Sequence, residues 1–198
     1  MRTILFTIFI LVGLLLSYNT AYADDVTNQI DKAKALYSQG KYSEAVNELN
    51  FAIGQIQSLQ IERYKVAFPK PLAGWEAGDF EGGAAGMAFM GGGTAVSRNY
   101  TANDGETSIK IEIVADSPLL SSIMMMISNP MFLGGNKVVS ISGEKAVEEW
   151  SDTDKSGQLQ IVVGNRMVIT VSGNGLASKD LLYSYANKID IAKLKSLM

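Results

Sequence analysis

One polar segment of the sequence, the Asp152 string, has the residue pattern of an ion-binding loop. The string reads Asp152-Thr153-Asp154-Lys155-Ser156-Gly157-Gln158-Leu159. Oxygen ligands at positions 1, 3 and 5, glycine at position 6 and an apolar residue at position 8 match the opening of a calcium loop. Val163 occupies position 12, where a bidentate glutamate is expected, and strands rather than helices are predicted on both sides. Asp152, Asp154 and Ser156 are therefore candidate calcium ligands, and a polar turn is the competing interpretation.

Most nucleophilic and metal chemistry is excluded by composition, because the chain has no histidine and no cysteine. Neither a Ser-His-Asp or Cys-His pair nor a zinc or haem site with His or Cys ligands can be built. Carboxylates such as Asp104 and Asp116 stand at predicted turns or element ends, where capping explains them. We therefore assign no catalytic residue and no cofactor, and we expect a protein that is not an enzyme. A sugar hydrolase that uses carboxylates alone is a third hypothesis, for which no convergent pair is evident.

Methionine is the second candidate for chemistry. Six of the nine methionines fall in two short segments: Met87, Met90, Met124, Met125, Met126 and Met131. Thioethers suit Cu(I), but three consecutive residues on a helix point in three directions and cannot share one ion. Core packing and an adaptable binding patch are the other interpretations.

A glycine-rich segment from Gly82 to Gly93 lacks the motifs that bind phosphate. We interpret it as a loop at the sheet edge. Exposed there, Met87, Phe89 and Met90 would form an apolar tip, and such tips mark contact sites.

The N-terminus has the three parts of a secretory signal peptide. Arg2 precedes an apolar run from Ile4 to Leu16, and Ala21-Tyr22-Ala23 offers a cleavage site. The run is shorter than the roughly 20 residues of a membrane-spanning helix. We expect removal of residues 1–23, a periplasmic mature chain and no mature transmembrane segment; an uncleaved anchor is the alternative.

The charge balance gives no support to nucleic-acid binding. The formal net charge is −3, whereas a nucleic-acid-binding protein presents a basic face. Without cysteine, stability must come from packing rather than from disulfides.

Residues 24–67 carry the periodicity of two helices. Ile30, Ala33, Leu36 and Tyr37 mark one stripe, and Gly40 ends it at a position suited to positive φ. A second stripe follows: Ala45, Val46, Leu49, Ala52, Ile53 and Ile56, continuing to Leu59. Two helices joined by so short a turn pack as an antiparallel hairpin.

Residues 29–57 resemble a single tetratricopeptide repeat. Gly40, Tyr42, Ala45 and Ala52 stand at the spacing of that repeat, and Gln57 replaces its usual proline. One such repeat does not bury its own apolar face. The resemblance implies that the hairpin either packs on the rest of the chain or binds a partner, with Tyr42 and Leu49 as contact candidates.

Pro69 and Pro71 mark a linker at residues 68–74, and strand patterns dominate residues 75–198. A hairpin is predicted around Asn103-Asp104-Gly105 and a helix over Leu119–Ser128. Further strands are predicted over Lys137–Ile141, Glu144–Trp150, Leu159–Val163 and Met167–Ser172, and a last helix from Ser178 to about Lys188. Across a two-residue Gly164-Asn165 loop, Leu159 and Ile161 share a face with Val168. The opposite face then holds Val162, Met167 and Ile169.

These elements predict an α+β fold: an N-terminal α-helical hairpin, then an antiparallel β-sheet domain covered by helices. The element order and the Gly74-Trp75 entry of residues 74–198 are similar to the PsbP-like α/β/α sandwich. Residues 84–100 and 116–130 also resemble a group of uncharacterised exported bacterial proteins, a resemblance that implies no activity.

The interpretation that we favour is a non-catalytic periplasmic protein-interaction module. Its partner would be another periplasmic or envelope protein. The alternative is a module that binds a small apolar ligand or calcium. An interaction protein should expose an apolar patch, whereas a ligand-binding module should enclose a pocket.

Overall fold

The computed structural model describes residues 25–83 and 93–198. The chain divides into two compact units, Met1–Ile56 and Gln57–Met198. The predicted signal peptide and the predicted contact residues Met87, Phe89 and Met90 lie outside the described residues. The α+β class and the N-terminal helical hairpin are confirmed.

The first unit is the helical hairpin. Its first helix covers residues 25–38, and α2 (Tyr42–Lys65) begins after a short turn and continues into the second unit. Gly40 has φ +75°, and its N–H donates to the Tyr37 carbonyl at 3.0 Å, as expected for a helix C-terminus. Ala33 and Ala45 are almost completely buried, because these small side chains let the helices approach closely.

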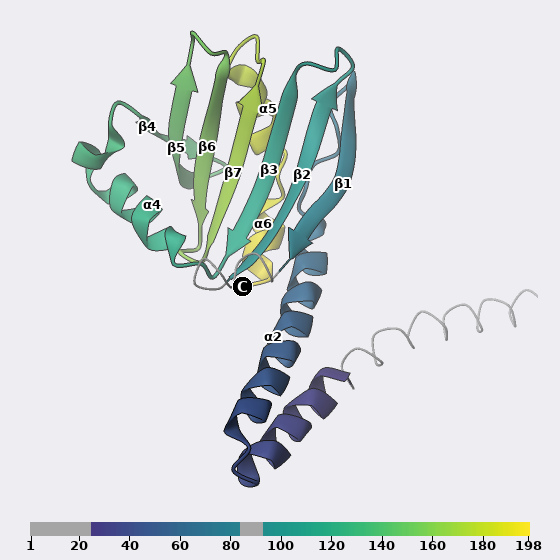
Figure 1. The fold of residues 1–198 in the computed structure, drawn as a ribbon. Helices are drawn as coiled ribbons and strands as arrows, with labels where there is room; N and C mark the ends of the chain where they lie inside the picture. Colours follow the sequence, from purple (N-terminus) through teal and green to yellow (C-terminus); the bar gives the residue numbers. More distant parts are fainter. Residues whose placement is uncertain (1–24, 84–92) are drawn as a thin grey trace, which may run out of the picture. The chain divides into compact units, whose positions relative to one another are not determined.

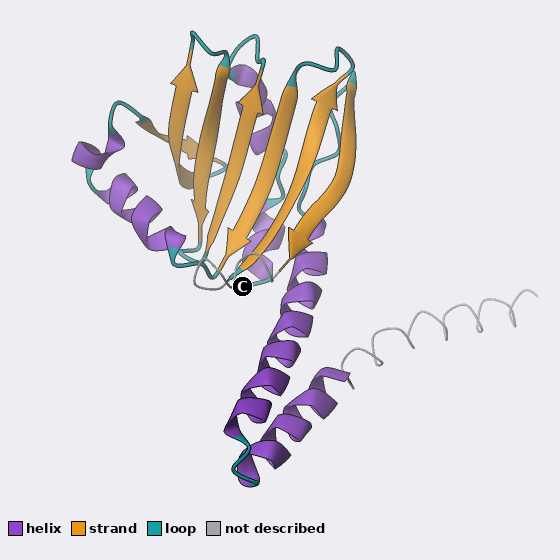
Figure 2. Cartoon of the chain, viewed as in Figure 1, coloured by secondary structure: helices purple, strands orange, loops and turns teal. Residues whose placement is uncertain are grey.

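The second unit contains a seven-stranded antiparallel sheet (Figures 1 and 2). Its strands are β1 (Trp75–Gly83), β2 (Thr94–Ala102), β3 (Ser108–Ala115), β4 (Lys137–Ile141), β5 (Glu144–Ser151), β6 (Ser156–Val163) and β7 (Met167–Asn174). The spatial order is β1-β2-β3-β7-β6-β5-β4. The last four strands therefore form a meander that joins β3 through β7, with β1 and β4 at the edges.

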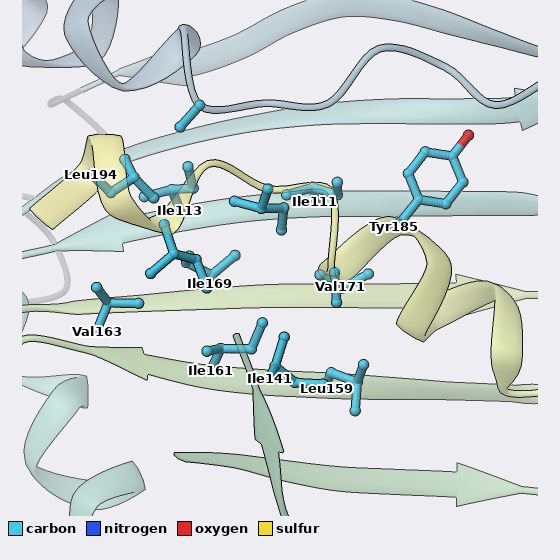
Figure 3. Packing of buried hydrophobic residues seen from close by; sticks show 14 of the residues in the cluster. Ile111, Ile113, Ile141, Leu159, Ile161, Val163, Ile169, Val171, Tyr185 and Leu194 are labelled. Atoms are coloured by element: carbon cyan, nitrogen blue, oxygen red, sulfur yellow. The ribbon is translucent and has the colours of Figure 1, made fainter. Parts of the chain in front are cut away.

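One sheet face carries the main core. Ile109, Ile111 and Ile113 alternate along β3 and are completely buried. Two C-terminal helices, α5 (Asp180–Ala186) and α6 (Ile191–Ser196), lie behind this face in Figure 1. Figure 3 shows sheet side chains gathered against Tyr185 of α5 and Leu194 of α6.

The opposite face has a smaller apolar cluster. Helix α4 (Leu119–Ser128) contacts β5 and β6, and its Leu120 packs with Val162 and Val168. A 3₁₀ helix, η1 (Pro130–Leu133), follows α4 before the chain enters β4. Helices therefore contact both faces of the sheet.

The predicted faces of the β6–β7 hairpin are wrong. Three residues, not two, connect these strands: Gly164, Asn165 and Arg166. The register therefore pairs Ile161 with Ile169 rather than with Val168. Because strand side chains alternate, this one-residue shift moves a whole strand's side chains to the other face.

The proline segment after α2 is packed rather than extended into solvent. Ala67 and Pro69 are buried, and the buried Tyr100 hydroxyl donates a 2.8 Å hydrogen bond to the Pro69 carbonyl. Tyr185 accepts a 3.4 Å hydrogen bond from the Leu72 N–H, and its ring lies 4.8 Å from that of Tyr100. Residues 67–72 are thus attached to the core of the second unit.

Three elements were not predicted: β1, the 3₁₀ helix η1 and α6. Strand β1 is polar and rich in glycine, and α6 is only 6 residues long, so neither gives a clear periodic signal. The predicted last helix ends at Ala186, before the expected Lys188. The α4 helix has the predicted bounds.

Candidate interaction surface

The helical hairpin carries an apolar groove between its two helices. The groove has a volume of about 460 Å³. It is lined by Ile30, Ala33, Lys34, Tyr37, Tyr42, Ala45, Val46 and Leu49, which we call the hairpin groove. Ala33 and Ala45, one from each helix, are the buried residues of this lining, at 2% and 4% exposed.

The walls of the hairpin groove are large apolar side chains that remain open to water. Tyr37 is 66% exposed, Tyr42 62% and Val46 54%. The rings of Tyr37 and Tyr42 lie 5.5 Å apart, one from each helix. The sequence-predicted contact residues Tyr42 and Leu49 therefore lie on one surface.

The side-chain interactions of Glu48 lie outside this groove. Glu48 pairs with the Lys32 ammonium at 2.6 Å and accepts a hydrogen bond from the Gln29 side chain. None of these three residues lines the hairpin groove, and Lys34 is the one charged residue among its eight. The groove therefore suits an apolar occupant with few charges.

The first four residues of the Asp152 string form the turn between β5 and β6, and Ser156 begins β6. The Trp150 indole N–H donates to Asp152 at 2.9 Å, and the Ser151 hydroxyl donates to Asp154 at 2.6 Å. Each carboxylate therefore has a partner within the turn. Among residues 25–83 and 93–198, no three His, Cys, Asp or Glu residues lie close enough together to hold a metal ion. The calcium hypothesis for Asp152, Asp154 and Ser156 stays a prediction.

Sequence reasoning missed a buried carboxylate on the core face. Glu148 of β5 is only 5% exposed, and both its oxygens accept hydrogen bonds from the Lys179 ammonium, at 3.0 and 3.1 Å. The Tyr183 hydroxyl also donates to it. The alternation of side chains along β5 could have indicated this burial, because Glu148 is two residues from Ala146 and therefore lies on the same, inward face of the strand.

The electrostatics of this trio keep Glu148 ionised. Desolvation opposes the charge, but hydrogen bonds from Tyr183 and Lys179 outweigh it and lower the pKa of Glu148. Burial and the hydrogen bond to Glu148 raise the pKa of Tyr183 to about 12. Neither group is poised to exchange a proton near neutral pH, which favours a structural role for the trio.

Glu148 also lines an open polar pocket of about 370 Å³ beside β4 and α5. The pocket includes Lys137, Trp150 and Asp152, but Asp152 already binds the Trp150 indole. Its carboxylates are therefore committed to neighbouring side chains and do not converge on the cavity.

The described methionines do not converge on one ion. Met124 packs with the small cluster under α4, whereas Met125 is 58% exposed and Met131 of η1 is 86% exposed. This divergence favours packing and surface roles over a thioether metal site.

Comparisons of this chain with protein-family models, with curated proteins and with solved structures found no match. None of the described helices is long and apolar enough to cross a membrane.

Proposed function

We propose that the chain is an exported, non-catalytic protein-interaction module that binds its partner through the helical hairpin. The observation that carries this proposal is the row of large exposed side chains around the hairpin groove. The signal-peptide pattern of residues 1–23 supports export, so the partner is expected among periplasmic or envelope proteins.

The free-energy cost of exposing large apolar side chains to water supports the idea that a partner covers the hairpin groove. Large apolar side chains left in water gain none of the roughly 1.5–3 kcal/mol that full burial of each would contribute. Tyr42, Val46 and Leu49 are all more than two-fifths exposed and adjoin one another. Contiguous apolar surface of this kind marks interaction sites in monomeric soluble proteins.

The shape of the hairpin supports a helical occupant. A groove between two antiparallel helices accepts the apolar face of a third helix, whose side chains meet it at helical spacing. Lys34 at the rim would favour an acidic residue beside the apolar face of that occupant. A small apolar molecule is the competing occupant, since about 460 Å³ falls within the usual range for ligand pockets.

A site-specific photocrosslinker tests the proposal. We would place a photoreactive phenylalanine analogue at Leu49, in the groove, and at exposed Lys145, on the sheet unit, as the matched control. Irradiation of cells should give protein adducts from position 49 and not from position 145. Absence of adducts at both positions, together with a purified chain that carries a bound small molecule, would replace the proposal with the ligand-binding alternative.

A further inference from the structure

Five of the large exposed apolar residues of α2 follow a heptad pattern, whereas Phe51 and Leu59 are exposed outside it. Tyr42, Val46, Leu49, Ile53 and Ile56 are separated by four, three, four and three positions. All five are between 41% and 62% exposed. This spacing places them on one side of the helix, the seam used by paired helices in coiled coils. Together with Ile30 and Tyr37 of the first helix, we call these residues the apolar stripe.

The stripe is distinct from the contact inside the hairpin. Ala45 and Ala52 of α2 are 4% and 2% exposed. They stand next to the seam on the helical wheel, seven positions apart. The alanines are therefore covered within the chain, whereas the larger side chains of the stripe, including the Tyr37 and Tyr42 rings that contact each other, keep 41–66% of their surface exposed.

The flanks of the seam allow an identical partner. Position 43 is serine and position 50 is asparagine, so the positions that follow the seam residues Tyr42 and Leu49 are uncharged. Charged residues at such flanking positions set partner choice in paired helices, and like charges would repel across a two-fold axis. These flanks of α2 therefore bring no like charges together across a two-fold axis, and Lys34 of the first helix is the one charged residue among those that line the hairpin groove. The β-branched residues Val46 and Ile53 flank Leu49 along the seam, a combination that suits helix pairing.

The area of the stripe matches what a dimer requires. Its seven residues are 41–66% exposed, which amounts to roughly 700 Å² of mainly apolar surface, close to the ~800 Å² that each partner contributes to a standard interface. A smaller patch would give only transient contact.

We propose that a second copy of this chain covers the apolar stripe, so that two hairpins pack as a four-helix bundle. The inference deepens the proposed function, since it rests on the hairpin being the interaction surface and names the partner. A two-fold axis lets the same stripe serve both copies, which is the commonest arrangement among soluble oligomers.

Sedimentation equilibrium of residues 24–198 tests self-association. The double variant V46E/I53E places two carboxylates per copy in the stripe and should weaken dimerisation by ~100-fold or more. N47E is the matched control, because Asn47 is exposed on α2 but lies away from the seam. It should dimerise as the unchanged chain does. An unchanged chain that stays monomeric at ~100 μM, or a dimer that V46E/I53E leaves intact, would overturn the proposal. Circular dichroism checks that the variants remain helical.

Disulfide trapping gives an independent readout, because the natural chain has no cysteine. A single cysteine introduced in turn at Val46, Leu49 and Ile53 can form a disulfide only with another molecule. At least one of these variants should give a disulfide-linked dimer rapidly under mild oxidation, and N47C should not. Equal trapping at all four positions would indicate random collision and overturn the proposal. Photoadducts at position 49 that contain a different protein would also overturn it, while leaving the proposed interaction function intact.

Discussion

Replacing Tyr100 with phenylalanine should change stability in opposite directions at neutral and alkaline pH. Tyr100 is completely buried at the centre of the second unit, and its hydroxyl donates to the Pro69 carbonyl at 2.8 Å. The variant keeps the ring and its contact with Tyr185 but loses that hydrogen bond. At pH 7 we expect Y100F to be less stable by about 1 kcal/mol, because a buried carbonyl loses its donor.

The alkaline effect has the opposite sign. Burial raises the pKa of Tyr100 to about 12, against about 10 in an unfolded chain. Above pH 10 the phenol ionises in the unfolded state while it stays neutral in the folded state. The free energy of unfolding of the unchanged chain therefore falls as the pH rises above 10, by about 1.4 kcal/mol at pH 11 and about 2 kcal/mol at pH 12. Phenylalanine does not titrate, so Y100F escapes this loss.

The two stability curves should cross near pH 11. Urea unfolding followed by circular dichroism between pH 7 and pH 12 measures the free energy of unfolding of both chains. The other ionisable groups are common to both chains, so their contribution cancels in the difference between the two free energies of unfolding. A stability difference that stays constant across this pH range would refute the assignment of Tyr100 as a buried, neutral hydrogen-bond donor.

Three further predictions follow from the sheet unit. K179M should lower stability by about 1 kcal/mol at pH 7, a modest value because the Lys179 side chain is 40% exposed. The loss should shrink in acid as pH falls through the lowered pKa of Glu148, and a pH-independent loss measured by urea unfolding would contradict the ion pair. G157A should cost about 1–3 kcal/mol, since the added Cβ would lie 2.5 Å from the Glu149 carbonyl oxygen; an unchanged melting temperature would show that the strand relaxes freely. Millimolar Ca²⁺ should leave the melting temperature unchanged, because Asp152 and Asp154 already accept hydrogen bonds from neighbouring side chains. A rise in melting temperature that the chelator EDTA reverses would support the calcium hypothesis.

Elements with a strong local signal could be predicted from the sequence. The alternation of Ile109, Ile111 and Ile113 identified β3, and the Asn103-Asp104-Gly105 turn identified its hairpin with β2. Gly40 marked the end of the first helix for a local reason, its positive φ. Strand β1 gave no such signal, because its polar, glycine-rich sequence pairs at the sheet edge through backbone groups.

Properties set by register or by tertiary neighbours could not be predicted. Arg166 belongs to the loop between β6 and β7, which makes the loop three residues long rather than two and decides which face of the sheet Val168 occupies. The pairing of Glu148 with Lys179 joins residues 31 positions apart, a distance that local patterns do not reach.

The candidate surface was only partly predictable. Periodicity placed Ala45, Val46, Leu49 and Ala52 on one stripe, whereas the structure separates buried alanines from exposed Val46 and Leu49. That separation depends on how closely the first helix approaches α2, and the small side chain of Ala33 allows a close approach.

The most direct test of the hairpin as an interaction surface is the rate of maleimide modification in intact cells. Single cysteines at Leu49 and Asn47 are compared, since both positions are exposed in the chain by itself. If a partner covers the apolar stripe, L49C should react at least tenfold more slowly than N47C in cells, and the two rates should converge in a dilute purified chain. Equal rates in cells would show that the stripe is uncovered, and would contradict the account.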